Sequence, residues 1–145
     1  MPIDARFIGK TYPAYTYEVG KEKIKEYARA IKNLDPHYVD DEFAQKSQYG
    51  AIIAPPTFAV VIGAYLIEPI FMDKDLNLNM PMIVHGEQEL EFLEVIKAGD
   101  SITSSAKIIA INNKEKLDVI AIEVKSKNQH GQDVCRGIYT FVERK

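Results

Sequence analysis

The feature that most constrains the fold of this chain is an abrupt change of hydrophobic period near its middle. From about Thr57 to Glu68 the residues are apolar on nearly every side of a helix, which is typical of a buried helix. Pro69 is expected to end or kink this helix. Beyond it, apolar and polar residues alternate, as along Ile120 to Val124, which is typical of half-buried strands. Helices followed by antiparallel strands indicate an α+β fold.

Four runs of strand-like alternation follow the buried helix, and turn signals separate them. The runs lie around Glu89–Phe92, Ile102–Ala110, Ile120–Val124 and Cys135–Phe141. The turn signals are Ala98-Gly99-Asp100, Asn112-Asn113-Lys114 and Gln129-His130-Gly131. We therefore predict four strands joined largely by hairpins, and we expect the single cysteine, Cys135, to be a small buried strand residue.

The first third of the chain predicts one strand and two helical segments. A short strand is expected from about Tyr15 to Val19. An amphipathic helix is expected from about Lys21 to Lys32, because apolar residues recur there at i, i+3, i+4 and i+7. Pro36 prevents this helix from continuing, and a short helical turn is expected over Asp40–Lys46. The residues between these two helical segments carry the most informative motif of the chain.

Composition limits the classes of function. The 145 residues are 46% hydrophobic and 27% charged, which predicts one globular domain over residues 1–145. A net charge of −3 without a basic run argues against nucleic acid and anionic membranes as partners. The longest apolar run, Phe58–Ile67, is too short to span a bilayer, and residues 1–6 lack the apolar stretch of a signal peptide. We expect a cytoplasmic protein without a bound metal, since no cluster has metal-ligand spacing.

The segment Asn33-Leu34-Asp35-Pro36-His37-Tyr38-Val39-Asp40 resembles the signature of the MaoC-like (R)-specific enoyl hydratases. In that family the motif D-x-N-P-[LIV]-H supplies an Asp and a His that hold and activate water. With Pro36 and Asp40 as anchors, Asn33 stands at the Asp position and Tyr38 at the His position. An amide has no proton to exchange near neutral pH, and a phenol titrates near 10. The motif therefore predicts substrate binding with degenerate catalytic positions.

Two further segments support the resemblance. Pro56-Thr57-Phe58 is similar to the start of the central helix in the non-catalytic N-terminal half of peroxisomal enoyl hydratases. His85-Gly86-Glu87-Gln88, followed by Leu90-Glu91, is similar to the HGEQ-x-L-E run of the same half. The whole pattern also resembles the A subunit of the mycolic-acid (3R)-hydroxyacyl-ACP dehydratase. The resemblance implies a hot-dog fold, in which a curved antiparallel sheet wraps around a long central helix.

The resemblance also implies a division of labour between two hot-dog units. A catalytic partner supplies the Asp and the His, and the degenerate unit completes the dimer and the acyl-binding channel. Active members place a His-Gly pair within the segment that reads Ala54-Pro55-Pro56-Thr57 here, and the Gly amide polarises the thioester carbonyl. Proline has no N–H to offer. The expected assembly is a homodimer or a heterodimer with a catalytic MaoC-like subunit, and the expected carrier of the acyl group is CoA or ACP, with no other cofactor.

Each candidate residue has a purely structural interpretation beside its functional one. Asn33 fits a left-handed helix cap. Asp35-Pro36 fits a simple turn, and the functional alternative is that Asp35 orients a substrate amide or water. His37 is either an exposed turn residue or a base displaced by one residue. Tyr38 is either a structural residue at the position of the family's His or a contact to the substrate or the partner subunit through its hydroxyl. Thr57 is either a helix cap or a group facing the thioester.

The segment from His85 to Gln88 is either an ordinary bulged strand or the lining of the acyl channel, because a glycine in a strand often marks a bulge. Two other functions stay open. A hot-dog acyl-CoA thioesterase uses a carboxylate near the central helix, whereas here only Glu68 approaches it, late in the segment. The second alternative is a non-enzymatic acyl-CoA-binding or scaffold protein. The sequence does not distinguish CoA from ACP or indicate the length of the acyl chain.

Overall fold

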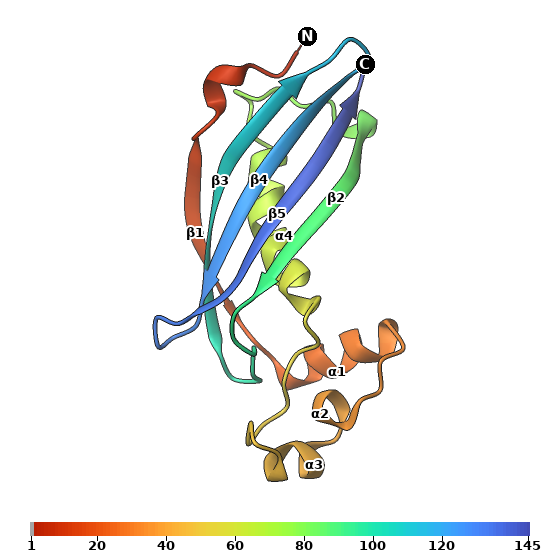
Figure 1. The fold of residues 1–145 in the computed structure, drawn as a ribbon, viewed down its shortest axis with the longest axis vertical. Helices are drawn as coiled ribbons and strands as arrows, with labels where there is room; N and C mark the ends of the chain where they lie inside the picture. The colour runs from red at the N-terminus through yellow and green to blue at the C-terminus, as the bar shows by residue number, and fades with distance from the viewer. Residues whose placement is uncertain (1) are drawn as a thin grey trace.

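Five antiparallel strands curve around one long helix in the computed structural model, which describes residues 2–145 (Figure 1). The strand order across the sheet is β1-β3-β4-β5-β2, so β1 and β2 form the two edges. The strands are β1 (Thr11–Glu18), β2 (Ile83–Phe92), β3 (Ser101–Asn113), β4 (Leu117–Lys127) and β5 (Asp133–Arg144). This arrangement confirms the predicted α+β hot-dog fold.

The central helix α4 (Phe58–Phe71) lies against the concave face of the sheet. Three short helices gather beyond one end of the sheet, while both chain ends lie at the opposite end (Figure 1). These helices are α1 (Lys21–Ala30), α2 (Pro36–Val39) and α3 (Asp41–Lys46). Single 3-10 turns, η1 (Ala5–Phe7) and η2 (Met80–Met82), precede β1 and β2. The motif segment therefore belongs to a helical lobe at one end of the hot-dog.

The buried side chains form two clusters along α4, because the helix is apolar nearly all round. Leu66 and Ile70 pack against the isoleucines of β3 and β4. Phe58 and Ile62 pack where β1 meets α1. Of the two outcomes expected at Pro69, an end of the helix is wrong, since α4 continues through Pro69 to Phe71. The core favours this last turn, because Ile70 is fully buried there.

Two local expectations fail because of bulges in the sheet. The first strand begins at Thr11 rather than near Tyr15, and its register shifts between Tyr12 and Tyr15, which accommodates a proline on an edge strand. In β3 the register shifts between Ile108 and Ala110, so the alternation expected over Ile102–Ala110 breaks there and Ile111 continues the buried face. A bulge exchanges the two faces of a strand, and simple alternation does not show where this happens.

The end of α1 also differs in detail from the expectation. Lys32, with φ 58°, takes the left-handed position instead of Asn33. The amide of Asn33 donates to the carbonyl of Ala28 and that of Lys32 to Arg29, which is the Schellman pattern of helix ends. Asn33 is therefore the residue that follows the cap. Its side-chain oxygen accepts from the amide of Asp35 at 3.4 Å.

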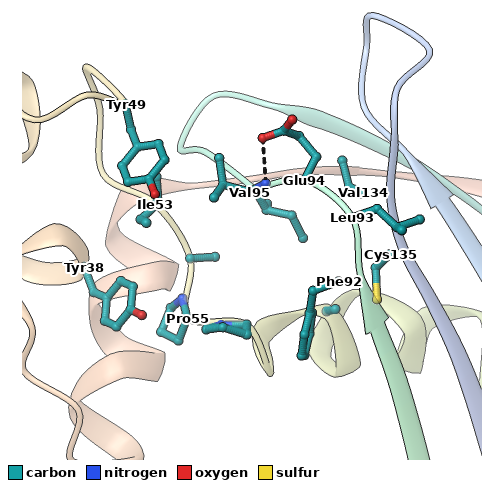
Figure 2. Close-up of a pocket in the computed structure, with 14 residues that line it drawn as sticks. Tyr38, Tyr49, Ile53, Pro55, Phe92, Leu93, Glu94, Val95, Val134 and Cys135 are labelled. Atoms are coloured by element: carbon teal, nitrogen blue, oxygen red, sulfur yellow. Dashed lines mark hydrogen bonds between the residues drawn. The ribbon is translucent and has the colours of Figure 1, made fainter.

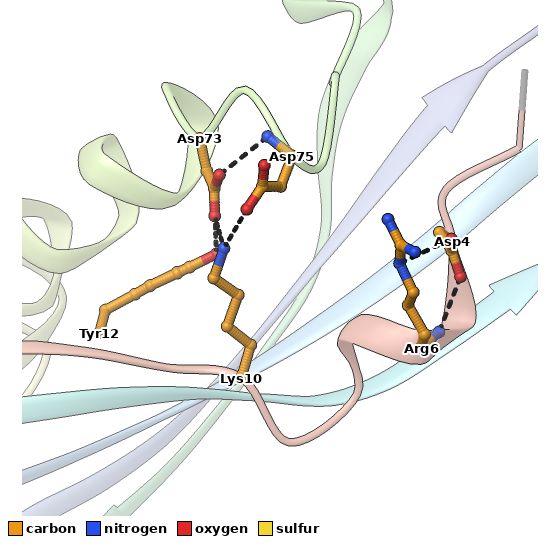
Figure 3. Close-up of polar contacts among 6 residues, drawn as sticks. All are labelled: Asp4, Arg6, Lys10, Tyr12, Asp73 and Asp75. Carbon is orange, nitrogen blue, oxygen red and sulfur yellow. Dashed lines mark hydrogen bonds and ion pairs between the residues drawn. The ribbon is translucent and has the colours of Figure 1, made fainter.

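A cluster of polar side chains joins the start of β1 to the loop that follows α4 (Figure 3). One carboxylate oxygen of Asp73 accepts from Lys10 Nζ at 2.6 Å and from the Tyr12 hydroxyl at 2.6 Å. Asp75 adds a second, more exposed contact to Lys10 at 3.1 Å. Burial by itself would raise the pKa of Asp73, but the bonds from Lys10 and Tyr12 outweigh it and hold the pKa below its usual value.

Replacing Asp73 with Asn should destabilise the fold by about 1–3 kcal/mol at pH 7, since two donors lose a charged acceptor. A carboxylate with a lowered folded pKa stabilises above its unfolded pKa, and the contribution is lost as the pH falls through the folded value. Urea unfolding of Asp73→Asn and wild type should therefore converge in strong acid. The matched control is Asp75→Asn, whose side chain is 66% exposed and which should cost less than about 1 kcal/mol.

Candidate functional site

The degenerate motif is held in place by the capping of α2. Asp35 is the N-cap residue, and its carboxylate accepts from the amide of His37 at 2.9 Å. Pro36 occupies the first turn, where a missing N–H costs nothing. The amide of Ile53 donates to the carbonyl of His37, and Lys25 pairs with Asp41 at 2.5 Å, so both neighbouring segments fix the lobe. The short helix at Pro36 is an element that the expected turn did not include.

A cavity of about 470 Å³ lies between this lobe, the start of α4 and the end of β2 (Figure 2). Its lining comes from four separate parts of the chain. The lining residues are Tyr38, Tyr49, Ile53, Ala54, Pro55, Pro56, Ala59, Phe92, Leu93, Glu94, Val95, Ile96, Val134 and Cys135. The lining is chiefly apolar with few polar groups, as is usual for sites that bind small organic molecules.

Tyr38 and His37 point to different places, as neighbouring residues of one helical turn must. Figure 2 shows the Tyr38 hydroxyl directed into the cavity, towards Pro55. The ring of His37 does not line this cavity. Its Nδ1 lies 2.7 Å from Asp35 Oδ1, and the ring packs edge-on against Phe43 at 4.9 Å between ring centres. Tyr38, which the resemblance aligns with the family's histidine, thus faces the cavity, and His37 does not.

The electrostatics of the motif disfavour acid–base work by this chain. Burial raises the pKa of Tyr38, and the nearby Asp35 and Tyr49 raise it further. The phenol is therefore neutral at physiological pH. The pKa of Asp35 is lowered, first by the hydrogen bond from the His37 amide and then by the His37 ring. Asn33 is exposed and does not line the cavity. The motif thus brings one neutral phenol to the cavity.

The wall opposite Tyr38 is formed by the approach to α4. Pro55 and Pro56 line the cavity, so neither position presents an N–H to a bound carbonyl. The side chain of Thr57 points away from the cavity, and its hydroxyl lies 2.7 Å from the hydroxyl of Tyr27 on α1. It makes no side-chain cap bond to α4 and is not among the cavity-lining residues. Thr57 therefore joins two helices at the rim.

The predicted segment from His85 to Gln88 lies on the edge strand β2, away from this cavity. The register shifts between His85 and Glu87, which confirms the bulge expected at Gly86. Opposite residues of antiparallel strands share a face, so His85 and Gln88 face α4 with Phe141 and Tyr139, while Glu87 faces outward with Thr140. His85 lines a second cavity of about 260 Å³ beside α4. The predicted site residues thus fall into two groups.

A comparison with known protein families decides what kind of chain this is. The profile described as the FAS1-like dehydratase domain region matches residues 6–136. The chain belongs to this family. Two relatives at about one-third identity cover nearly its whole length. A UPF0336 protein of Saccharopolyspora erythraea is 37% identical over 99% of this chain and 93% of its own. A UPF0336 protein of Streptomyces avermitilis is 34% identical over 99% and 97%.

Solved structures confirm the resemblance to the MaoC-like hot-dog proteins. The truncated HadBC (3R-hydroxyacyl-ACP dehydratase) complex from Mycobacterium tuberculosis superposes with a TM-score of 0.81. That match has 25% identity and covers 94% of this chain and 96% of the other. A MaoC-like dehydratase superposes with a TM-score of 0.84 and 24% identity, over 94% of this chain and 42% of the other. The second likeness supports the fold alone.

Sequence reasoning missed part of the cavity wall of this FAS1-like dehydratase-region chain. Tyr49, Phe92 and Leu93 carry no motif, and their places depend on how three loops meet. The signal nearest to them was the HGEQ-x-L-E run, because Phe92 and Leu93 follow it directly. Over residues 2–145, no helix is long and apolar enough to cross a membrane. The same residues contain no group of three potential His, Cys, Asp or Glu metal ligands.

Cys135 lines the cavity from β5, where it is buried as expected. Burial raises its pKa to about 11, with a smaller contribution from Glu91. Only the thiolate reacts with disulfide reagents. At pH 8 the native protein should therefore react with a chromogenic disulfide roughly a hundredfold more slowly than an ordinary thiol of pKa about 8.5. Stopped-flow absorbance measurements of the thiol reaction on native and guanidinium-unfolded protein test this. Equal reaction rates for the two forms would contradict the burial of Cys135.

Proposed function

We propose that this chain is the substrate-binding, non-catalytic subunit of a (3R)-hydroxyacyl-thioester dehydratase, or of the enoyl hydratase that runs the reverse reaction. One observation carries the proposal: a neutral tyrosine, Tyr38, faces the cavity at the position where the family's histidine stands. The acyl group is carried on CoA or ACP. The cavity is large enough for an acyl thioester end, and its chiefly apolar lining suits a hydrocarbon chain.

The chemistry explains why such a subunit needs a partner. Dehydration requires one group that removes the α-proton and one that protonates the departing hydroxyl. Asn33 provides neither, and the raised pKa of Tyr38 makes it a poor base at neutral pH. A MaoC-like partner with an intact D-x-N-P-x-H motif would supply both groups. Because this is acid–base chemistry, the proposal requires no cofactor besides the phosphopantetheine carrier.

The edge strand β2 is the proposed interface with the partner. An unpaired edge promotes association unless it is covered. Large apolar side chains are exposed along and just beyond this strand, with 44% exposure for Val84, 52% for Phe92 and 49% for Leu93. Phe92 and Leu93 also line the cavity, so a partner at this edge would close it. The degenerate motif favours a heterodimer, because a homodimer would contain two copies of the same deficient site.

The test is reconstitution with a MaoC-like chain that carries the intact motif, chosen from the same genome. The two purified chains should elute together on size exclusion, and the mixture should hydrate crotonyl-CoA or a longer enoyl thioester. The readout is the loss of enoyl-thioester absorbance. Replacing Phe92 and Leu93 with Asp should abolish both co-elution and activity, whereas Phe43→Asp, at an exposed position of α3 outside the cavity lining, should not. A partner that is equally active without this chain would refute the proposal.

A thioesterase remains the second candidate because of one observation. Glu68 of α4 and His85 of β2 both line the second cavity, so a carboxylate and an imidazole share one apolar pocket. Hot-dog thioesterases use a carboxylate near the central helix to direct water at the thioester. Release of free thiol from butyryl-CoA and palmitoyl-CoA by the purified chain, lost in Glu68→Gln, would favour this candidate over the dehydratase subunit.

A further inference from the structure

The two cavities lie in line along one surface between α4 and the sheet. On β5, Cys135 lines the first cavity, and Tyr139 and Phe141 line the second. On β2, Phe92 lines the first and His85 the second. Residues 135 and 139 are separated by about 13 Å along an extended strand. The two cavities thus share α4, β2 and β5 as walls but no lining residue, and the first of them begins beside Tyr38.

The ring of Tyr139 lines the second cavity, four residues along β5 from Cys135, which lines the first. Two glycines flank it and provide its space. A Cβ atom on Gly63 of α4 would overlap the Tyr139 hydroxyl and would lie 2.7 Å from its Cζ. A Cβ atom on Gly137 would lie 3.1 Å from Tyr139 Cε1 and 3.3 Å from Leu90 Cδ2. The ring therefore spans from the sheet to the helix, and no larger residue fits at either glycine without moving it.

One polar atom beside Tyr139 lacks a hydrogen-bond partner. The side-chain carbonyl oxygen of Gln88 is buried and accepts no hydrogen bond from residues 2–145. Gln88 is the direct cross-strand neighbour of Tyr139. A buried acceptor without a partner costs stability and is uncommon in folded proteins. The side chains around Tyr139 thus leave one buried acceptor without a hydrogen bond.

We propose that Tyr139 limits the length of the acyl chain bound in the first cavity, and that the second cavity is the continuation of the same channel. This inference rests on the proposed acyl-thioester function. The occupant is a linear saturated hydrocarbon chain, because the second cavity is lined by aliphatic and aromatic side chains with Glu68 and His85 as its ionisable groups. The cavity beyond the barrier, about 260 Å³, would accept further methylenes once Tyr139 is shortened.

The experiment measures binding rather than turnover. Calorimetric titration of the purified chain uses saturated acyl-CoA thioesters from C4 to C16 and, separately, free fatty acids from C6 to C14. Each buried methylene strengthens binding about fourfold, equivalent to about 0.8 kcal/mol. For the wild type, affinity should rise with chain length and then level off. For Tyr139→Leu the rise should continue over two or more further methylenes, at least about a tenfold gain.

Three variants separate the barrier from a general change in the core. Tyr139→Phe keeps the ring and should level off at the wild-type length. Tyr139→Met offers a flexible replacement if the leucine variant folds poorly. Ala64→Phe fills the second cavity from the solvent-exposed face of α4 and, combined with Tyr139→Leu, should restore the wild-type limit. Thermal unfolding of each variant confirms that the protein titrated is folded.

Each outcome decides the proposal. A limit that stays at the same length in the leucine and methionine variants overturns it, as does a wild type whose affinity rises without a limit or that binds no probe. A limit that moves for free fatty acids, while CoA thioesters do not bind, supports the barrier and counts against the proposed function. Binding of thioesters with an unmoved limit supports the function and refutes the barrier.

Discussion

The purified chain alone should hydrate crotonyl-CoA and longer enoyl thioesters at least about 10²–10⁴-fold more slowly than its complex with a catalytic partner. The reason is that each missing acid–base role typically costs that much. Tyr38 is the only motif residue in the cavity, and its raised pKa keeps it protonated at pH 7. Initial rates of absorbance loss at equal active-site concentration, for the chain, the partner and the mixture, give the ratio directly.

Restoring the motif tests whether the residues themselves cause the deficit. Asn33→Asp combined with Tyr38→His should raise the rate of the isolated chain above wild type and leave it well below that of the complex. Full recovery is not expected, because Pro55 and Pro56 give no N–H to the thioester carbonyl. The single variant Asn33→Asp serves as the control and should have no effect. Robust hydration by the wild-type chain alone, abolished by His37→Ala, would show instead that the motif acts one residue out of register.

Replacing Phe58 with Ala should lower the free energy of unfolding by about 3–5 kcal/mol, the usual cost of removing a fully buried aromatic ring. Phe58 is the first residue of α4, and its ring packs edge-on against Tyr17 of β1 and Tyr27 of α1, with centres 6.1 and 5.4 Å apart. This loss is a large fraction of the 5–15 kcal/mol that typically stabilises a domain. Urea unfolding monitored by circular dichroism measures it.

The matched control is Phe43→Ala in α3. Its side chain is 43% exposed and packs edge-on against His37, so the loss should stay below about 1 kcal/mol. Because Phe58 joins the helical lobe to the body, its loss should also speed amide exchange in α1 and α2 more than in β4. Equal losses for the two variants would mean that the lobe is not anchored through Phe58.

The arrangement of the elements followed from local patterns in the sequence. The all-round apolar segment at Phe58–Ile67 requires burial on every side, and the alternating runs after it require a sheet with one buried face. A wrapped central helix satisfies both conditions. The substitutions at Asn33 and Tyr38 were equally visible, since the chemistry of a side chain does not depend on where it packs. The bulge at Gly86 was predicted for a similar reason, because a glycine in a strand has few other uses.

The tertiary structure alone decided how the candidate residues share space. It placed Tyr38 in the first cavity and His37 outside it, because the capping of α2 by Asp35 sets the rotation of one short turn. It also assigned His85 and Tyr139 to a second cavity. These positions depend on bulges and on loops that meet from distant parts of the chain. Hydrophobic periodicity records which face of an element is buried, whereas it does not record which distant side chains meet there.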